Sequence, residues 1–462
     1  MTAPLAARLP ALVAHLETDL LERGAAVRLG LLAALAGEHV LLIGPPGTAK
    51  SELARRLHRA FADARYFERL LTRFSTPEEL FGPLSLKALE DDRYERLTDG
   101  YLPTAGVAFL DEVFKANSAI LNALLTLLNE REFDNGAGRT HTPLISVVAA
   151  SNEVPVDESL HAFYDRFLLR VPVQPVGDAS FARLLALPAL PQPAAEPAPI
   201  AREELAALAL AAARVALPQA VLDHLHALRG WLAPHSIAVS DRRWRQLVAL
   251  LRTAAASEGR DHVDALDLWL VPYVVAHEPA QVPALAQWFV DAVMQAAPND
   301  APWLVRAVEA FEAQLQIEQS APAEDANDDA AGKLALARSV GGAQEGNAML
   351  RIVSEALEAK SRRRWSPVHI AARLAQVDEV AARARAPRAA IAAQADALAR
   401  DVAGRIWQPP ELARALQANL AHTLAVLDSM LTRLAAARAG FGELPEDASL
   451  AGAMPAPIAL SA

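Results

Sequence analysis

The stretch Gly44–Ser51, with the sequence GPPGTAKS, carries the residues best suited to chemistry in this chain. It follows a short apolar run and opens a helical pattern, a setting in which a glycine-rich loop turns its N–H groups onto phosphate oxygens. Lys50 would reach the β- and γ-phosphates, and Ser51 would ligate Mg²⁺. Ala49 stands where the usual pattern has glycine, and a chance glycine-rich turn is the alternative. The predicted phosphate site comprises Gly44, Pro45, Pro46, Gly47, Thr48, Ala49, Lys50 and Ser51.

Two acidic residues end a second apolar run, VAFLDE at 107–112. Asp111 would hold Mg²⁺, directly or through water, and Glu112 would orient and polarise the attacking water as a general base. A solvated acidic strand end is the alternative for this common pattern. Placed after the glycine-rich loop, the pair predicts hydrolysis of ATP to ADP with Mg²⁺ as cofactor.

A third apolar run, at 144–152, ends in Asn152, whose amide can hydrogen-bond the attacking water or the γ-phosphate. An asparagine that caps the following turn is the alternative. In the segment VSDRRW at 239–244, Arg242 could fold back onto the bound nucleotide. Arg243 is the second candidate for that role, and a solvated arginine is the alternative.

The segment FYDRFLLRV at 163–171 contains two further arginines. Arg166 is the first candidate to enter a neighbouring subunit's site and stabilise charge on the γ-phosphate, as an arginine finger does. Arg170 is the second candidate. The alternative is a surface ion pair of Arg166 with Asp165 or Glu158.

Composition limits the class of protein. The chain has 462 residues, enough for about two to four domains, and a formal charge of −11. An acidic chain binds nucleic-acid phosphates poorly, so we expect no nucleic-acid partner. The lack of cysteine excludes disulfides, thiolate zinc sites and cysteine nucleophiles. Because there is no signal-peptide pattern and no apolar run of roughly 18 residues, we expect a cytoplasmic protein without membrane insertion.

Changes in periodicity and composition divide the chain. Apolar runs at 39–44, 106–112 and 144–152 alternate with segments of helical spacing, which predicts a parallel sheet covered by helices. We expect an ATPase core at 1–186, a Pro/Ala linker at 187–200, an all-α lid at 201–280, a helical connector at 281–319, a flexible acidic and glycine-containing segment at 320–347, a helical C-terminal domain at 348–440 and a disordered tail at 441–462.

The C-terminal extension carries a leucine stripe from Leu412 to Leu434 at spacings of three and four. Pro387 and the pair Pro409–Pro410 should divide this extension into separate helices, because proline removes a helical hydrogen bond. A helical hairpin or a three-helix bundle is the expected packing.

The segments GPPGTAKS, VAFLDE, AASNE and YDRFLLR, in this order and spacing, resemble the MoxR family of AAA+ ATPases over roughly residues 10–280. Segment 74–112 resembles the family's helix-2 insert, a strand pair between the P-loop helix and the acidic strand, and VSDRRW most resembles the RavA branch. The resemblance implies a homohexameric ring with chaperone-like activity and a von Willebrand factor A-domain partner. It supports the roles given above for Lys50, Ser51, Asp111, Glu112, Asn152, Arg166 and Arg242.

We therefore expect an α/β AAA+ P-loop core with a parallel sheet, an all-α lid and an α-helical C-terminal extension. The ring would use ATP hydrolysis to remodel partner complexes or help them mature. One alternative is an AAA+ motor that acts on nucleic acid, which salt-sensitive binding would reveal. Another is a nucleotide-dependent scaffold without significant turnover, which the presence of both Glu112 and Asn152 disfavours.

Overall fold

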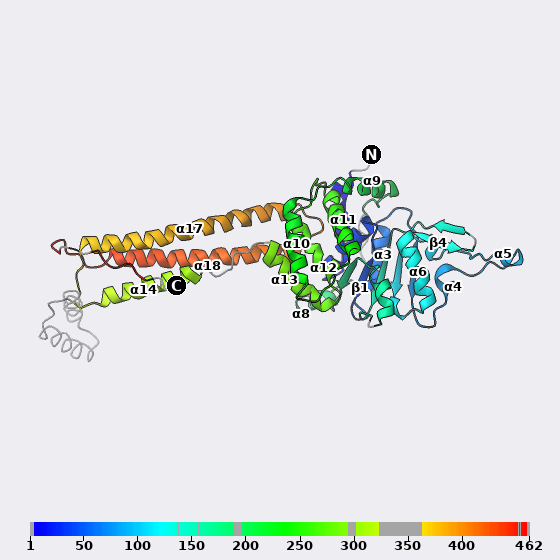
Figure 1. Cartoon of the computed structure of the whole chain (residues 1–462), viewed down its shortest axis with the longest axis horizontal. Coiled ribbons are helices and arrows are strands. Elements are labelled where there is room, and N and C mark those ends of the chain that lie inside the picture. The colour runs from blue at the N-terminus through cyan, green and yellow to red at the C-terminus, as the bar shows by residue number, and fades with distance from the viewer. Residues whose placement is uncertain are drawn as a thin grey trace. The chain divides into compact units, whose positions relative to one another are not determined.

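Five short strands form a parallel sheet in the order β2-β3-β6-β1-β7 in the computed structural model of the protein (Figure 1). All residues of β1 and β6 are buried, as expected of parallel strands covered on both faces. The three predicted apolar runs are β1, β3 and β6, which confirms the α/β core. The strands are β1 Val40–Ile43, β2 Tyr66–Leu70, β3 Val107–Asp111, β6 Ser146–Ser151 and β7 Leu169–Pro172.

The structure describes residues 4–136, 138–155, 157–188, 196–293, 302–322, 363–450, 452 and 454–459. The chain forms two compact units, each discontinuous in sequence. The first comprises Met1–Gln295 and Asp401–Ala413, and the second comprises Ala296–Arg400 and Arg414–Ala462. Half of the expected linker at 187–200, namely 189–195, lies outside the described residues, as does most of the expected flexible segment at 320–347.

The helices of the core follow from apolar spacing and capping, as α6 illustrates. Its N-cap Asn117 accepts a hydrogen bond from the N–H of Ile120 at 3.1 Å. Ile120, Leu124 and Leu127 recur at helical spacing and are fully buried. The core helices are α1 Leu5–Glu17, α2 Gly24–Leu35, α3 Lys50–Arg59, α6 Ser118–Glu130, α7 His161–Tyr164 and α8 Asp178–Leu185, with short 3-10 turns at Leu102–Thr104, Val113–Lys115 and Glu158–Leu160.

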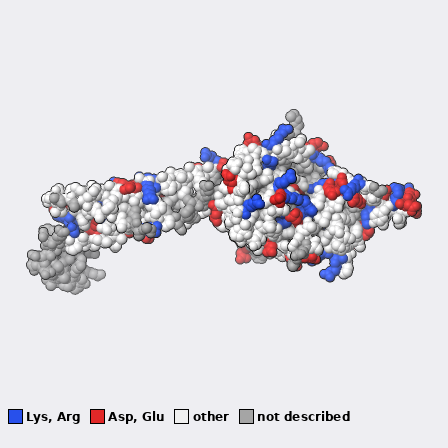
Figure 2. All heavy atoms as spheres, viewed as in Figure 1, with Lys and Arg blue, Asp and Glu red and all other residues white. Residues whose placement is uncertain are grey.

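The insert between β2 and β3 differs from the expected strand pair. It contains two short helices, α4 Pro77–Phe81 and α5 Leu86–Glu90, and one antiparallel bridge between Leu84 and Arg96. Pro83 lacks the N–H that a β-ladder requires, and the Ser85 hydroxyl caps α5. The segment therefore forms a helix in place of the expected strand pair. Acidic and basic side chains gather around α5, at the end of the insert (Figure 2). A separate hairpin, β4 Glu132–Asn135 with β5 Gly138–His141, follows α6.

The all-α lid is confirmed, and its central helix, α11, is fixed to the core by one buried arginine. Arg243, 2% exposed, donates to the carboxylate of Asp165 at 3.1 Å and to the carbonyl oxygens of Leu168 at 2.9 Å and Val274 at 2.7 Å. Its hydrogen bonds therefore join the loop before β7 to the lid. The lid elements are α9 Arg202–Ala212, α10 Gln219–Leu232, α11 Asp241–Ser257, α12 Val271–Val275 and α13 Val282–Val293, with 3-10 turns η4 Ala265–Leu270 and η5 Pro279–Gln281.

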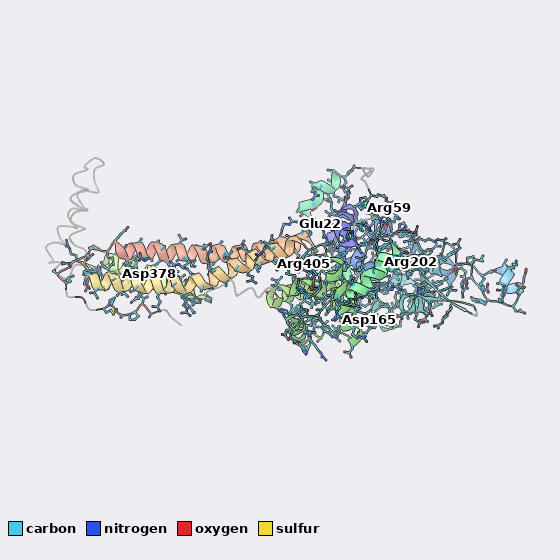
Figure 3. All side chains as sticks on the ribbon, turned by 90° about the horizontal axis from the view of Figure 1, so that it is seen from above. Glu22, Arg59, Asp165, Arg202, Asp378 and Arg405 are labelled. Atoms are coloured by element: carbon cyan, nitrogen blue, oxygen red, sulfur yellow. The ribbon has the colours of Figure 1, made fainter. Side chains whose placement is uncertain are left out.

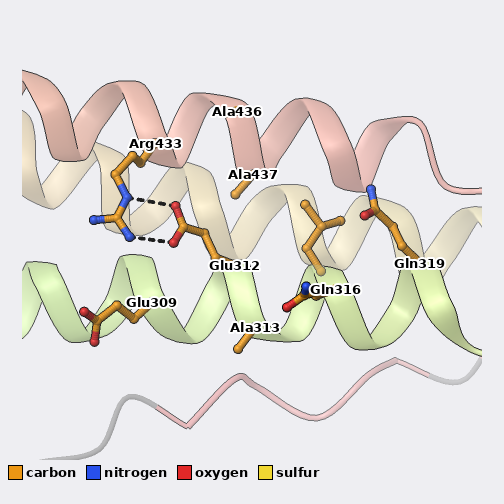
Figure 4. Close-up of a pocket in the computed structure, with 9 residues that line it drawn as sticks. Glu309, Glu312, Ala313, Gln316, Gln319, Arg433, Ala436 and Ala437 are labelled. Atoms are coloured by element: carbon orange, nitrogen blue, oxygen red, sulfur yellow. Dashed lines mark hydrogen bonds and ion pairs between the residues drawn. The ribbon is translucent and has the colours of Figure 1, made fainter.

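The second unit is helical, as expected, and charged pairs join its helices. It contains α14 Pro302–Ser320 and most of α17 Pro367–Ala403 and α18 Pro410–Gly442. Arg433 on α18 pairs with Glu312 on α14 beside an open groove of about 490 Å³ (Figure 4). Arg388 on α17 pairs with Asp428 on α18 at 2.8 Å. Such exposed pairs contribute about 0–1 kcal/mol each, so they orient the helices more than they stabilise them.

Two expectations for the C-terminal extension are corrected. Pro387 lies inside α17 and does not end it, because the side chains of Ala384 and Ile391 on either side of it are buried and hold the helix by packing. Pro410, by contrast, begins α18. Part of the expected disordered tail is ordered, since the N–H of Asp447 donates to the carbonyl oxygen of Trp365 at 2.9 Å.

Replacing Arg243 by alanine should lower the free energy of unfolding by about 3 kcal/mol, because buried carbonyl groups on both sides would lose their donor. Urea unfolding followed by circular dichroism measures this change. Arg245→Ala, at an exposed position of the same helix, is the control and should change the free energy by less than about 0.5 kcal/mol. Equal losses for the two variants would contradict the structural role of Arg243.

Candidate functional site

The loop Gly44–Ser51 leaves the carboxyl end of β1 and has a backbone shape that explains its sequence. A Cβ atom on Gly44 would lie 1.9 Å from the carbonyl oxygen of Val173, so only glycine fits there. Gly47 and Ala49 both have positive φ, at 80° and 64°. Glycine is usual at the position of Ala49 because the backbone there is left-handed, which glycine adopts freely. Alanine adopts the same conformation at a cost of about 1 kcal/mol.

Lys50 begins α3 and its side chain is buried beneath this loop. Its Nζ donates to the carbonyl oxygens of Gly44 and Pro45, each at 2.8 Å. Burial lowers the pKa of Lys50, while the nearby carboxylates of Asp111 and Glu112 oppose that shift. The fold therefore places the ammonium group between the loop and both predicted carboxylates.

Glu112 and Asn152 meet directly, because β3 and β6 are neighbours and both side chains follow the carboxyl ends of these strands. The Asn152 amide Nδ2 donates to Glu112 Oε1, and Lys115 Nζ lies 3.3 Å from Glu112 Oε2. Glu112 has a left-handed backbone, with φ of 51°. Strained residues of this kind are concentrated at functional sites, where the surrounding structure fixes them. Asp111 Oδ1 accepts from the N–H of Glu112 at 3.0 Å.

Arg23 supports the loop, a role that no sequence motif predicted. Its buried guanidinium donates to the carbonyl oxygen of Thr48 at 3.1 Å and to that of Gln174 at 2.6 Å. Burial lowers the pKa of Arg23. No local pattern marks this role, since the partners are backbone carbonyl groups 25 and 151 residues away along the chain.

The two candidate finger residues have different surroundings. Arg170 is buried within its own chain, where it lies 4.0 Å from the ring centre of Tyr164 and donates to Ala276 O at 3.0 Å. Arg166 is half-buried, and its Nε has no hydrogen-bond partner among the described residues. The carboxylate of Asp165 is held by Arg243 and Arg170 instead. The side chain of Glu158, the other expected partner of Arg166, lies outside the described part of the chain.

Arg242 does not lie near the nucleotide loop of its own chain, which corrects the expected fold-back. Its Nη2 donates to Asn129 Oδ1 at 3.3 Å at the end of α6, and its charge acts on Glu38, just before β1. These residues lie at the amino edge of the sheet, whereas the loop leaves the carboxyl edge, roughly 13 Å of strand away. The buried Arg243 fixes the start of α11 at the amino edge and so holds Arg242 there.

A cavity of about 510 Å³ is lined by Glu22 and Gly24, the two sequence neighbours of Arg23, which itself donates to Thr48 in the loop. Trp269, Tyr273 and Phe289 of the lid give it aromatic walls. Glu17, Asp19 and Glu22 line the side formed by the N-terminal segment. The volume is within the range of pockets that hold small ligands, so the cavity can accept a nucleoside next to a phosphate-binding loop.

In the described residues, no helix has the combination of length and apolar composition that a membrane crossing requires.

Two family models match the chain. Residues 7–209 match the MoxR domain of the MoxR-vWA-beta-propeller ternary systems, and residues 220–289 match an AAA lid domain. The second match coincides with the lid helices from α10 to α13.

Several curated proteins are similar to the chain. Two uncharacterized proteins of Methanocaldococcus jannaschii are 44% identical over 247 residues and 42% identical over 266 residues, covering 53% and 57% of this chain. The chain spans 64% of the first, just under two thirds, and 70% of the second. Protein MoxR of Paracoccus denitrificans is 31% identical over 167 residues, which cover 35% of this chain and 48% of that protein. The sheet, the loop at the end of β1 and these matches together show that the chain belongs to the MoxR family of AAA+ ATPases.

Proposed function

We propose that the protein hydrolyses ATP at the carboxyl edge of the sheet and uses the reaction to remodel partner proteins. The contact of Asn152 with Glu112, beside the buried Lys50, is the observation that carries this proposal. In the proposed site, Glu112 would be the general base, Asn152 the orienting amide and Lys50 the phosphate-binding cation. A scaffold without turnover would need the loop and the lysine but not this oriented carboxylate.

Mg²⁺ fits the residues at this edge. The hydroxyl of Ser51 and the carboxylate of Asp111 are hard oxygen ligands of the kind that Mg²⁺ prefers, and Ser51 follows the lysine in the first turn of α3. When bound, the ion would neutralise charge on the β- and γ-phosphates. ATP and ADP are accordingly the proposed nucleotides.

Residues of this chain would bind the nucleotide and transfer the proton. The N–H groups of the loop and Lys50 bind the phosphates, and the aromatic cavity takes the base and the ribose. Glu112 accepts a proton from the attacking water. Asn152, through its hydrogen bond, holds the Glu112 carboxylate in one orientation for that transfer.

A ring of subunits, with six as the expected number, would complete the site. Arg166 is the proposed finger, because Arg170 is occupied within its own fold. Arg242 is exposed at the amino edge, so any contact it makes with a nucleotide would be with that of a neighbouring subunit.

The proposed partner is a von Willebrand factor A-domain protein, with chaperone-like action on a client complex in the cytoplasm. The family model for MoxR domains of MoxR-vWA-beta-propeller systems, matched over residues 7–209, supports this partner. Placement in the RavA branch stays a prediction. A motor on nucleic acid is the weaker alternative, given the formal charge of −11.

Lys50→Ala should abolish nucleotide binding, because the loop loses the cation that reaches the phosphates. Glu112→Gln should retain binding and lose about 10²-fold or more of ATP turnover, because the general base is removed. Titration with a fluorescent ATP analogue and a phosphate-release assay measure the two effects. Glu203→Gln, at an exposed position in α9, is the control and should match the wild type. Unchanged binding by Lys50→Ala would refute the phosphate site.

Arg166→Ala should leave binding intact and lower turnover by about 10³-fold, the usual effect of an arginine finger. Mixing this inactive variant with inactive Glu112→Gln should restore activity, since some sites then combine an intact Glu112 with a neighbour's Arg166. Arg59→Ala, exposed on α3, serves as the control for loss of charge. If no activity returns although mixed rings form, Arg166 does not act between subunits.

Glu112→Gln, held with ATP and Mg²⁺, should co-purify with a von Willebrand factor A-domain protein from its native cell extract. The same variant carrying Lys50→Ala should lose this partner, because capture depends on bound nucleotide. Mass spectrometry of the captured proteins provides the measurement. Recovery of nucleic acid would favour the motor, and recovery of the chain alone would favour the scaffold.

A further inference from the structure

The link between α17 and α18 belongs to the first unit and is fixed there by its own side chains. We call residues Arg405–Leu412 the tail anchor. Trp407 is 2% exposed, and its indole Nε1 donates to the hydroxyl of Ser257 at 2.7 Å, at the end of α11. The N–H of Ile406 donates to Glu258 Oε1 at 2.7 Å. The tail anchor is therefore bound to the lid through a buried aromatic side chain and directed hydrogen bonds.

Arg405, which Figure 3 labels, adds a charged contact to the lid. Its guanidinium binds the carboxylate of Asp264 and lies 3.1 Å from Asp267 Oδ1, and Arg260 pairs with Asp267 at 2.6 Å. Burial lowers the pKa of Arg405 to about 10 and raises the pKa of Asp267 to about 6. Removing one partner from such a cluster leaves a buried charge uncompensated, so the cluster resists detachment of the anchor.

The tail anchor also contacts the core. Arg28 on α2 donates from Nη1 to the carbonyl oxygen of Ile406 and pairs with Glu17 at 2.7 Å. Glu17 lines the cavity that Glu22 and Gly24 also line, and α2 begins directly after Arg23, which donates to Thr48 of the loop. The anchor thus joins the lid to the helix that follows the loop-supporting arginine.

Three residues of the tail anchor, Pro409, Glu411 and Leu412, line this same cavity. The rest of the lining includes the aromatic side chains of the lid, the acidic residues of the N-terminal segment, and Arg183. Apolar walls suit a planar base, and carboxylates accept hydrogen bonds from an exocyclic amine and from ribose hydroxyls. The same carboxylates repel phosphates, which the loop and Lys50 attract.

We propose that the tail anchor forms part of the pocket for the base and ribose of the nucleotide, so that the C-terminal extension helps to set nucleotide affinity. This inference rests on the proposed ATPase function. Because coupling between two sites is reciprocal, nucleotide binding also restrains the anchor, and with it the two long helices that enter and leave it. The C-terminal extension then regulates the nucleotide site.

The absence of cysteine from the sequence permits a direct test with single thiols. Leu412→Cys places one thiol on the cavity wall, and a chromogenic disulfide reagent measures its rate of modification. Saturating MgADP should slow this rate at least about fivefold in the full-length protein. Leu210→Cys, at a position 66% exposed on α9, is the matched control and should react equally fast with and without MgADP.

A second variant gives an independent readout. Leu412→Ala should raise the dissociation constant of a fluorescent ADP analogue about fivefold, the effect of losing about 1 kcal/mol of apolar contact with the base. Leu210→Ala should leave the constant unchanged. If ADP binds but neither protects the thiol nor responds to Leu412→Ala, the tail anchor is not part of the pocket. If ADP does not bind to the wild type at all, the proposed ATPase function itself fails.

Discussion

The position of the lid depends on Arg243, a charged side chain that is buried only because acceptors surround it. Desolvation lowers its pKa, and Asp165 with several backbone carbonyl oxygens offsets that cost. Because these acceptors come from the loop before β7 and from α12, Arg243 joins this loop of the core to two helices of the lid. The position of Arg242, the preceding residue on α11, follows from this attachment.

The attachment of the lid through Arg243 leaves the candidate site residues and Arg242 at opposite edges of one sheet. Lys50, Glu112 and Asn152 come together at the carboxyl edge, where neighbouring parallel strands end side by side. Arg242 is held at the amino edge. A single subunit cannot bring these edges together without dismantling its sheet. The proposed ring would achieve this by stacking the amino edge of one copy toward the carboxyl edge of the next.

Sequence reasoning succeeded where a signal is local and failed where it is distant. The buried strands β1, β3 and β6 are continuous apolar runs, and the loop residues follow a compact pattern, so both could be predicted. Strand β2 mixes exposed Glu68 with buried Phe67 and gives no such run. Arg23 and the tail anchor act on partners that lie far away in sequence, and their residue types are ordinary. Pro387 shows the converse, since tertiary packing overrides a strong local helix breaker.

Because the first unit is discontinuous in sequence, its two parts are synthesised at different times on the ribosome. Residues 1–295 emerge first, yet the socket for Trp407 beside Ser257 can be filled only after residues 296–400 have been made. At about 5–20 residues per second, this leaves the socket open for roughly 5–20 s of synthesis. During that interval the lid exposes apolar surface that the finished protein hides. The lid is therefore completed only when the tail anchor reaches it, late in synthesis.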